Sequence, residues 1–300
     1  MEVLLVNARH VKNVPGRKSD ALDAVWLAEL TECGLLRGSF IPPPEIAAIR
    51  ELTRYRKKLI EQRTSELQRL AKVLEDSGIK IDSVASKLTT LSARDMIEAL
   101  IAGERDPAVL ADLARGVMRK KIPELTMACA GRFGDRHALM CTLHLEHIDH
   151  LADMIARLDT RIDEATLPFA RQTELLATIP GIGVYSAMIL LSEIGEVQRF
   201  SSAKALYSYA GLVPWVRESA GKKSRGGISR CGSPRLRWVM VEAAHTAVRC
   251  SPAAKSYFER MRQRKHPHVA RVALARKLLG AAYALLRDGV CFDESIFAAV

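Results

Sequence analysis

The sequence predicts a mainly α-helical protein, in which a long antiparallel coiled-coil arm leads to a compact helical carboxy-terminal domain. Two long stretches repeat apolar side chains at helical spacing, and the other apolar runs are short and separated by Gly or Pro. Near the start, only residues 3–7 (VLLVN) read as a strand. Apolar residues make up 48% of the 300 residues, so the chain can bury a core.

The first helices follow a Pro-Gly turn. One is expected from about Ser19, with apolar residues at helical spacing up to Leu30, and the prolines at 42–44 bar its continuation. A long helix is expected from Glu45 to about Ser77. Its apolar positions repeat every seven residues and predict a helix–helix seam: Ile60, Leu67 and Leu74, with Leu70 between them.

A second long helix is expected over residues 135–166, closed by Pro168. Its apolar residues alternate three and four apart, which again predicts a seam: Ile148, Leu151, Ile155, Leu158 and Ile162. Between the long helices, residues 81–131 read as short helices, with a capping box at Ser92 and Asp95 and a start at Asp106. Beyond them, the short helices expected for the carboxy-terminal domain span about 170–194, 201–210, 233–249, 252–264 and 268–287.

Charge and composition favour an anionic partner. The net charge of +11 fits nucleic acid first and an acidic membrane surface second. No apolar run has the length of a membrane span, and the first residues lack the features of a signal peptide. The six cysteines are scattered without a C-x-x-C pair, which is typical of reduced thiols and a cytoplasmic protein and argues against structural zinc.

The stretch IPGIG (179–183) lies between two apolar helical segments and has the pattern of a helix-hairpin-helix turn. Its glycines allow a tight turn, so N–H groups at the start of the next helix can face a DNA phosphate. The expected DNA contacts are Pro180, Gly181 and Gly183. A plain turn between two helices would have the same pattern and would bind nothing.

The stretch KSDALDA (18–24) places Asp20 and Asp23 three residues apart, on one face of a first helical turn. Two neighbouring carboxylates with hard oxygen atoms suit Mg²⁺. The alternative needs no metal, because Asp in a first helical turn is favoured by capping and by the helix dipole.

The stretch RESAGKKSRGGISRCGSPRLR (217–237) places Ser219 in a basic, glycine-rich loop before an apolar helix. A serine hydroxyl can attack a phosphodiester, and nearby cations would stabilise the charge that develops on the phosphate. A plain phosphate-binding loop is the alternative. The cations expected to contact DNA are Arg217, Lys222, Lys223, Arg225 and Arg230.

Three histidines, His144, His147 and His150, follow one another at intervals of three. Zinc pairs on a helix are usually four apart, so these residues read as solvated or interfacial side chains rather than as metal ligands.

Together these segments resemble the IS110 family of insertion-sequence transposases, which have an amino-terminal RuvC-like (RNase H-like) DEDD nuclease domain and a carboxy-terminal serine-bearing domain. The resemblance covers most of the chain, in the same order and spacing. The matching segments are VPGRKSDALDAVWLAELTECGLL (14–36), TIPGIGVYSAMILLSEIG (178–195), ALYSYAGLVP (205–214), ESAGKKSRGGISRCGSPRLRWVMVEAA (218–244) and ARKLLGAAYALL (275–286).

The resemblance implies a recombinase of mobile DNA that is guided by a structured RNA from the element and acts in the bacterial cytoplasm, associated with the nucleoid. Asp20 and Asp23 match the last two acids of the DEDD set, which binds Mg²⁺, and Ser219 matches the nucleophile. The long helices match a coiled coil that contributes to assembly as a dimer or tetramer and to RNA contact. The expected RNA contacts on that coil are Arg54, Lys57 and Lys58.

The resemblance also predicts a division at 1–40 (the end of a RuvC-like domain), 41–168 (helical arm) and 169–300 (serine-bearing domain with the helix-hairpin-helix). The first two acids of the DEDD set have no match here, since Glu2 does not stand in the corresponding motif. The chain is therefore expected to be truncated at its amino terminus, with half of the metal site. The alternatives are a non-catalytic DNA- and RNA-binding remnant and, less compatible with the serine loop, a repair nuclease subunit.

Overall fold

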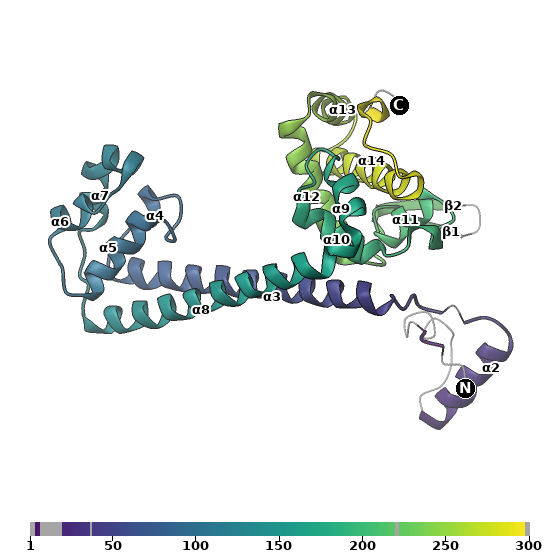
Figure 1. Ribbon diagram of the computed structural model, residues 1–300, viewed down its shortest axis with the longest axis horizontal. Helices are drawn as coiled ribbons and strands as arrows, with labels where there is room; N and C mark the ends of the chain where they lie inside the picture. The colour runs from purple at the N-terminus through teal and green to yellow at the C-terminus, as the bar shows by residue number, and fades with distance from the viewer. Residues whose placement is uncertain (1–3, 7–19, 37, 220–221, 298–300) are drawn as a thin grey trace.

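Two long helices dominate the computed structural model, which describes residues 4–6, 20–36, 38–219 and 222–297. For residues 20–23, 216–219 and 222–225 it describes the backbone alone. Helix α3 (Pro44–Asp76) and helix α8 (Asp135–Thr166) run antiparallel along one another and form the arm (Figure 1). Pro44 is the first residue of α3, where its missing N–H is no loss.

The apolar seam of the arm is only partly the predicted one: on α3, Leu70 and Leu74 are buried as predicted, but Ile60 and Leu67 are half-buried and Leu59 and Glu66 are buried in their place. Near the middle, Leu59 of α3 packs with Leu151 and Ile155 of α8. Ile162 is also buried, while Ile60 and Leu158 are half-buried at the edge of the seam. Supercoiling of the two helices stays a prediction, but their lengthwise packing gives the molecule its elongated shape.

Short helices form a small cap at the far end of the arm. They are α4 (Ile81–Val84), α5 (Leu91–Ile101), α6 (Pro107–Asp112), a 3₁₀ turn (Gly116–Lys121) and α7 (Ile122–Ala128). The predicted start of α6 is confirmed, because Asp106 accepts a hydrogen bond from the Ala108 N–H at 2.8 Å.

The predicted capping box at Ser92 is wrong. Thr90 caps α5 instead, and its hydroxyl accepts a hydrogen bond from the Ala93 N–H. The Ser92 side chain is buried and accepts from the Arg115 N–H at 2.8 Å. A tertiary contact therefore uses the hydroxyl that the sequence pattern assigned to the helix end.

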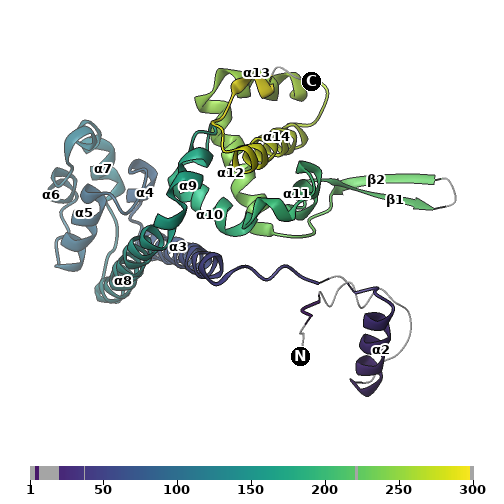
Figure 2. The same ribbon diagram turned by 45° about the vertical axis from the view of Figure 1, so that its right-hand side comes forward.

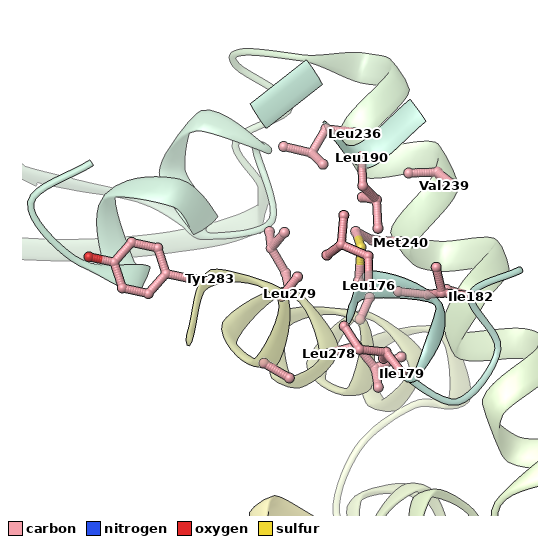
Figure 3. Close-up of a cluster of buried hydrophobic side chains, with 14 of the residues drawn as sticks. Leu176, Ile179, Ile182, Leu190, Leu236, Val239, Met240, Leu278, Leu279 and Tyr283 are labelled. Atoms are coloured by element: carbon pink, nitrogen blue, oxygen red, sulfur yellow. The ribbon is translucent and has the colours of Figure 1, made fainter. Parts of the chain in front are cut away.

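The carboxy-terminal body packs six helices around one core: α9 (Ala170–Ala177), α10 (Val184–Ile194), α11 (Ala203–Tyr209), α12 (Pro234–Cys250), α13 (Pro252–Arg262) and α14 (Pro267–Asp288). Figure 3 shows Leu176, Leu190, Met240 and Leu278 meeting in that core. Helices α12 and α14 pack against each other, and both bury several alanines along with larger apolar residues.

The only two strands within the described residues form a hairpin on this body. Strand β1 (Pro214–Ser219) pairs antiparallel with β2 (Lys222–Ile228), and the hairpin projects away from the helices (Figure 2). The mainly helical class is therefore confirmed.

The amino-terminal part lies beyond the start of α3, at the opposite end of the arm from the cap (Figures 1 and 2). It contains helix α2 (Asp20–Glu32), which confirms a helix in this segment, while the predicted start at Ser19 lies outside the described residues. Of the expected strand, residues 4–6 are described, and Val6 makes a single antiparallel bridge to Gly38. A relation to the RuvC fold stays a prediction.

Candidate nucleic-acid interface

Ser219 is the last residue of β1, at the free end of the hairpin. The register pairs Ser219 with Lys222, Glu218 with Lys223 and Arg217 with Ser224. Residues 214–228 hold four Arg or Lys and a single acid, so the projecting element is strongly basic. The sequence analysis expected a loop here, and the structure replaces it with paired strands.

Trp215 and Gly226 face each other near the base of the hairpin. A Cβ atom on Gly226 would lie 2.0 Å from the Cε2 atom of the Trp215 ring, so only glycine leaves room for the indole. The pairing is irregular between Pro214 and Val216, as at a β-bulge. The indole therefore packs on the partner strand, and this packing sets the shape of the hairpin base.

The chain that leaves the hairpin is anchored at Ser233. Its backbone N–H donates to the Tyr209 carbonyl at 2.9 Å, and its hydroxyl caps α12 by accepting from the Leu236 N–H at 3.1 Å. The same hydroxyl donates to a carboxylate oxygen of Glu193 at 2.9 Å. The base of the hairpin is therefore held to both α11 and α10.

Glu193 joins this anchor to the arm. Its side chain is 1% exposed, and its two carboxylate oxygens accept from Nε and Nη2 of Arg54 at 2.9 and 3.0 Å. Arg50, one turn earlier on α3, donates to the backbone carbonyl of Ser192 at 2.9 Å. A buried carboxylate is costly without such partners, so this joint fixes α3, α10 and the start of α12 in one arrangement.

Two of the three predicted RNA contacts have partners within the protein. Arg54 is bound to Glu193. The Lys57 ammonium lies 4.3 Å from the centre of the Trp238 ring on α12 and 3.5 Å from Glu61. Lys58 is exposed. The basic face of α3 near the body thus serves first to pack the arm against the body.

The IPGIG turn connects α9 to α10, as predicted, but its glycines differ in role. Ile179 and Ile182 are buried in the core (Figure 3). Gly181 has φ +84°, and a Cβ atom there would lie 2.2 Å from the Ala243 carbonyl oxygen on α12. Gly183 is exposed, precedes the first turn of α10 and has no atom within 4 Å of its Cβ position.

Packing within the protein therefore requires glycine at position 181, because the turn lies directly on the backbone of α12 and leaves no room for a side chain. Pro180 is half-buried beside it. Of the three predicted DNA contacts in the turn, Gly183 is the one that faces solvent, at a helix start that no side chain caps. The turn therefore keeps one position at which a phosphate can approach backbone N–H groups.

Asp20 and Asp23 stand one helical turn apart at the start of α2. Their side chains lie outside the described part of the structure. Within that part, no group of three or more His, Cys, Asp or Glu side chains is placed to hold a metal ion. The two aspartates can supply at most part of an Mg²⁺ coordination shell.

The histidines of α8 are solvated or interfacial, as predicted. His144 contacts the carboxylate of Glu66 across the seam, with 2.9 Å between Nδ1 and Oε2, and His147 and His150 are exposed. The Glu66 side chain is only 6% exposed. Burial acts to raise the pKa of Glu66. The hydrogen bond with His144 and the charges of Arg69 and His147 lower the pKa by more than burial raises it, so the pKa of Glu66 lies below its ordinary value of 4.5.

Sequence reasoning missed the Glu193 joint. Its signal is a single acid in the otherwise apolar run AMILLSEIG (187–195), because a charged residue on a buried helix needs a partner. The partner itself lies 139 residues away on α3, beyond the reach of any local pattern.

Among the described helices, none combines the length and apolar character that crossing a bilayer requires.

The structure is a helical body with a projecting basic hairpin, joined to a long helical arm. The sequence of this chain is similar to those of insertion-sequence transposases. Residues 173–259, which include the turn and the hairpin, match the "Transposase IS116/IS110/IS902 family". Residues 1–78, which include α2 and α3, match the DEDD transposase domain of the IS110 type. The chain thus carries the transposase domains of the IS110/IS116 family.

Individual relatives agree with this assignment. A "Probable family 20 transposase" of Pseudomonas aeruginosa is 26% identical over 97% of this chain and 78% of its own length. The "Transposase for insertion sequence element IS1328" of Yersinia enterocolitica is 24% identical over 98% of this chain and 79% of its own. The "Pilin gene-inverting protein" of Moraxella bovis is 36% identical over 50% of this chain and 49% of its own.

Proposed function

We propose that this protein is a DNA transposase that cuts and rejoins DNA strands through the hydroxyl of Ser219. The transposase domains support DNA as the substrate. The observation that carries the choice of Ser219 is its position, because it ends β1 at the tip of the projecting hairpin, opposite Lys222. A residue at such a tip meets a bound duplex before the helical body does.

The reaction is a pair of transesterifications. The Ser219 Oγ attacks phosphorus, an Oγ–P bond forms, and the bond from phosphorus to one sugar oxygen breaks. The serine proton passes to a base, and the leaving sugar oxygen takes up a proton. A sugar hydroxyl of another strand then attacks the phosphoserine and releases Ser219, so one phosphodiester is exchanged for another and no nucleotide is consumed.

The cations of the hairpin and its exit would hold the attacked phosphate and stabilise the negative charge that grows on it: Arg217, Lys222, Lys223, Arg225 and Arg230. The Glu193–Ser233 contact supports this role, because it fixes the base of the element that carries them. The exposed start of α10 at Gly183 would bind a second phosphate of the same duplex through backbone N–H groups.

Asp20 and Asp23 would hold Mg²⁺ together with ligands from outside the described residues. When bound, the metal would polarise the phosphate and lower the pKa of the attacking hydroxyl. The position of both aspartates in the first turn of α2 supports this role, since residues three apart stand on the same face of a helix.

The arm would serve assembly and RNA contact. Lys58 is the member of the predicted RNA-binding set that is exposed and makes no ion pair with a described residue. On α8, Leu139 and Leu143 are 61% and 50% exposed on one face, which supports burial against another chain in a dimer or tetramer. A structured guide RNA of the element is the proposed second partner.

The test is a search for a covalent DNA–protein adduct on denaturing gels. The purified chain is incubated with end-labelled DNA, Mg²⁺ and RNA transcribed from the DNA that flanks its gene. We expect an adduct with the wild type and with Ser224→Ala, which is the matched control in β2, and none with Ser219→Ala, at equal DNA affinity.

An adduct that persists in Ser219→Ala would remove Ser219 from the mechanism. DNA binding by the wild type without any adduct would favour the alternative, a non-catalytic DNA- and RNA-binding protein.

A further inference from the structure

A long stretch of the carboxy-terminal body has positive charge and no acidic residue. Between Glu259 and Asp288 the sequence holds eight Arg or Lys and no Asp or Glu. Some of these cations pack inward, and Arg276, for example, lies over the Tyr207 ring. Others gather where α13 ends and α14 begins, and residues 262–269 are all exposed there.

We call this region the basic corner. It consists of the exposed cations and histidines of the turn, together with the first arginine of α14 that follows them: Arg262, Arg264, Lys265, His266, His268 and Arg271. A neighbouring helix extends it, because Arg271 Nη1 lies 2.6 Å from the Nδ1 atom of His245 on α12. Arg249, one turn further along α12, is also exposed.

The charge of the basic corner is poorly neutralised. Arg262 pairs with Glu259 at 3.2 Å. The contact of Arg271 is an imidazole rather than a carboxylate. Arg264 and Lys265 make no ion pair with any described residue. Exposed cations without carboxylate partners create a local positive potential that attracts a polyanion.

The titration of His245 agrees with that potential. Burial lowers the pKa of His245, and the positive charges of Arg271, Arg249 and His268 lower it further, while Glu242 acts in the opposite direction. Three basic groups and one acid, Glu242, act on the His245 ring, so the electrostatic surroundings of this ring are positive on balance.

We propose that the basic corner is a second DNA-binding surface, which holds the phosphate backbone of a duplex without reading its bases. Arginine suits this task because its planar guanidinium matches two phosphate oxygens at once. The members of the corner include no Phe, Tyr or Trp, and the Phe258 ring that Arg271 covers at 5.1 Å is buried. Proteins stack single-stranded bases on accessible aromatic side chains. A duplex therefore fits the corner better than a single strand does.

This surface is separate from the hairpin. Helix α13 lies at the top of the body in both views, whereas β1 and β2 extend to one side of it (Figures 1 and 2). With two phosphate-binding surfaces on one body, the protein could bind the duplex at phosphates that lie away from the one that reacts. Since both belong to one chain, binding at one raises the effective concentration of DNA at the other.

The experiment measures the salt dependence of duplex binding by the full chain, using fluorescence anisotropy of a labelled duplex of arbitrary sequence. The variant is Arg264→Gln with Lys265→Gln. Each phosphate contact on B-DNA contributes about 0.9 to the slope of log affinity against log salt, so two lost contacts should reduce the slope by about 1.8. Affinity should fall by at least about tenfold near 0.1 M salt, equally for all sequences.

The matched control removes the same formal charge elsewhere. Arg119 and Arg136 are exposed near the far end of the arm and already pair with Asp112 and Asp76. Arg119→Gln with Arg136→Gln should leave the slope unchanged. Equal losses in the two double variants would overturn the proposal in favour of a general charge effect.

An unchanged slope in the Arg264/Lys265 variant would also overturn the proposal. So would a slope change that occurs with a structured RNA probe and not with duplex DNA. The test is independent of the serine chemistry, because it needs no Mg²⁺ and no adduct. A wild-type chain that forms no adduct can still show the predicted change in slope.

Discussion

Arg54 of the arm and Glu193 of the body share a two-point ion pair, with 2.9 and 3.0 Å between their nitrogen and oxygen atoms. Glu193 is buried, and its second oxygen also accepts from Ser233 at the exit of the hairpin. One carboxylate thus links the arm to the element that carries Ser219. The stability of the arm–body joint and the placement of the hairpin depend on the same residue.

The first prediction concerns this pair. Arg54→Ala leaves the buried carboxylate without its main partner and should destabilise the protein by about 2–4 kcal/mol. Glu193→Ala should cost a similar amount, and the double variant should be less destabilised than the sum of the two, by about 1–3 kcal/mol. Chemical denaturation of the four proteins measures this coupling.

Lys58→Ala is the matched control, because Lys58 is exposed on the same helix. Its effect should stay within about 0.5 kcal/mol. Additive losses in the Arg54–Glu193 cycle would contradict a direct role of the pair in holding the joint.

The two glycines of the IPGIG turn should separate structure from binding. At Gly181 a methyl group would collide with the backbone of α12, and φ is +84°, so Gly181→Ala should cost about 2–4 kcal/mol. At Gly183 the space is open and φ is −85°, so Gly183→Ala should be nearly neutral. Thermal unfolding of the two variants tests the contrast.

Gly183→Val then tests phosphate contact in a folded protein. If a phosphate meets the backbone at this helix start, the bulkier side chain should weaken duplex binding and lower the salt slope by about 1. Binding equal to that of the wild type would mean that the turn serves packing alone.

Local patterns predicted the arm well and the site only in part. The bounds of α8 match the prediction at both ends, and α3 begins and ends within one residue of it, because a long apolar repeat with Pro and Gly at its ends leaves few alternatives. The hairpin was missed. Glycine and lysine are rare in strands, so the sequence around Gly226 and Gly227 reads as a loop until the two halves are paired.

The arm–body contacts could not be predicted for a different reason. Arg54 and Lys57 look like free cations on a helix face, and only the packing of α3 on α10 and α12 gives them Glu193 and Trp238 as neighbours. Such partners are far apart in the sequence. A local sequence pattern shows that a cation stands on one face of a helix, but it does not show which distant residue neutralises that cation.

The hairpin base should respond differently to two adjacent glycines. A valine at Gly226 would overlap the Trp215 ring, whereas no atom lies within 4 Å of the Cβ position of Gly227. Gly226→Val should therefore displace the indole and loosen the hairpin, and Gly227→Val should not. Hydrogen exchange of the backbone amides in β1 and β2 measures the difference. Equal protection in both variants would show that the contact between Trp215 and Gly226 does not hold the strands.

The arm should lose stability in acid because of Glu66. The pKa of its carboxyl group is below the ordinary value of 4.5 in the folded protein, since His144, Arg69 and His147 favour the charged form more than burial disfavours it. A carboxylate with a lowered pKa stabilises the folded state at pH values above 4.5, and this contribution fades as the pH falls from 4.5 through the folded pKa.

Thermal unfolding followed by circular dichroism between pH 7 and about pH 3 should therefore show a steeper acid loss in the wild type than in Glu66→Gln, which cannot titrate at this position. Glu75→Gln is the control, because Glu75 is exposed on the same helix and makes no ion pair with a described residue. The control should keep the wild-type profile. If Glu66→Gln and Glu75→Gln have the same acid profile, the contact between Glu66 and His144 does not govern the stability of the arm.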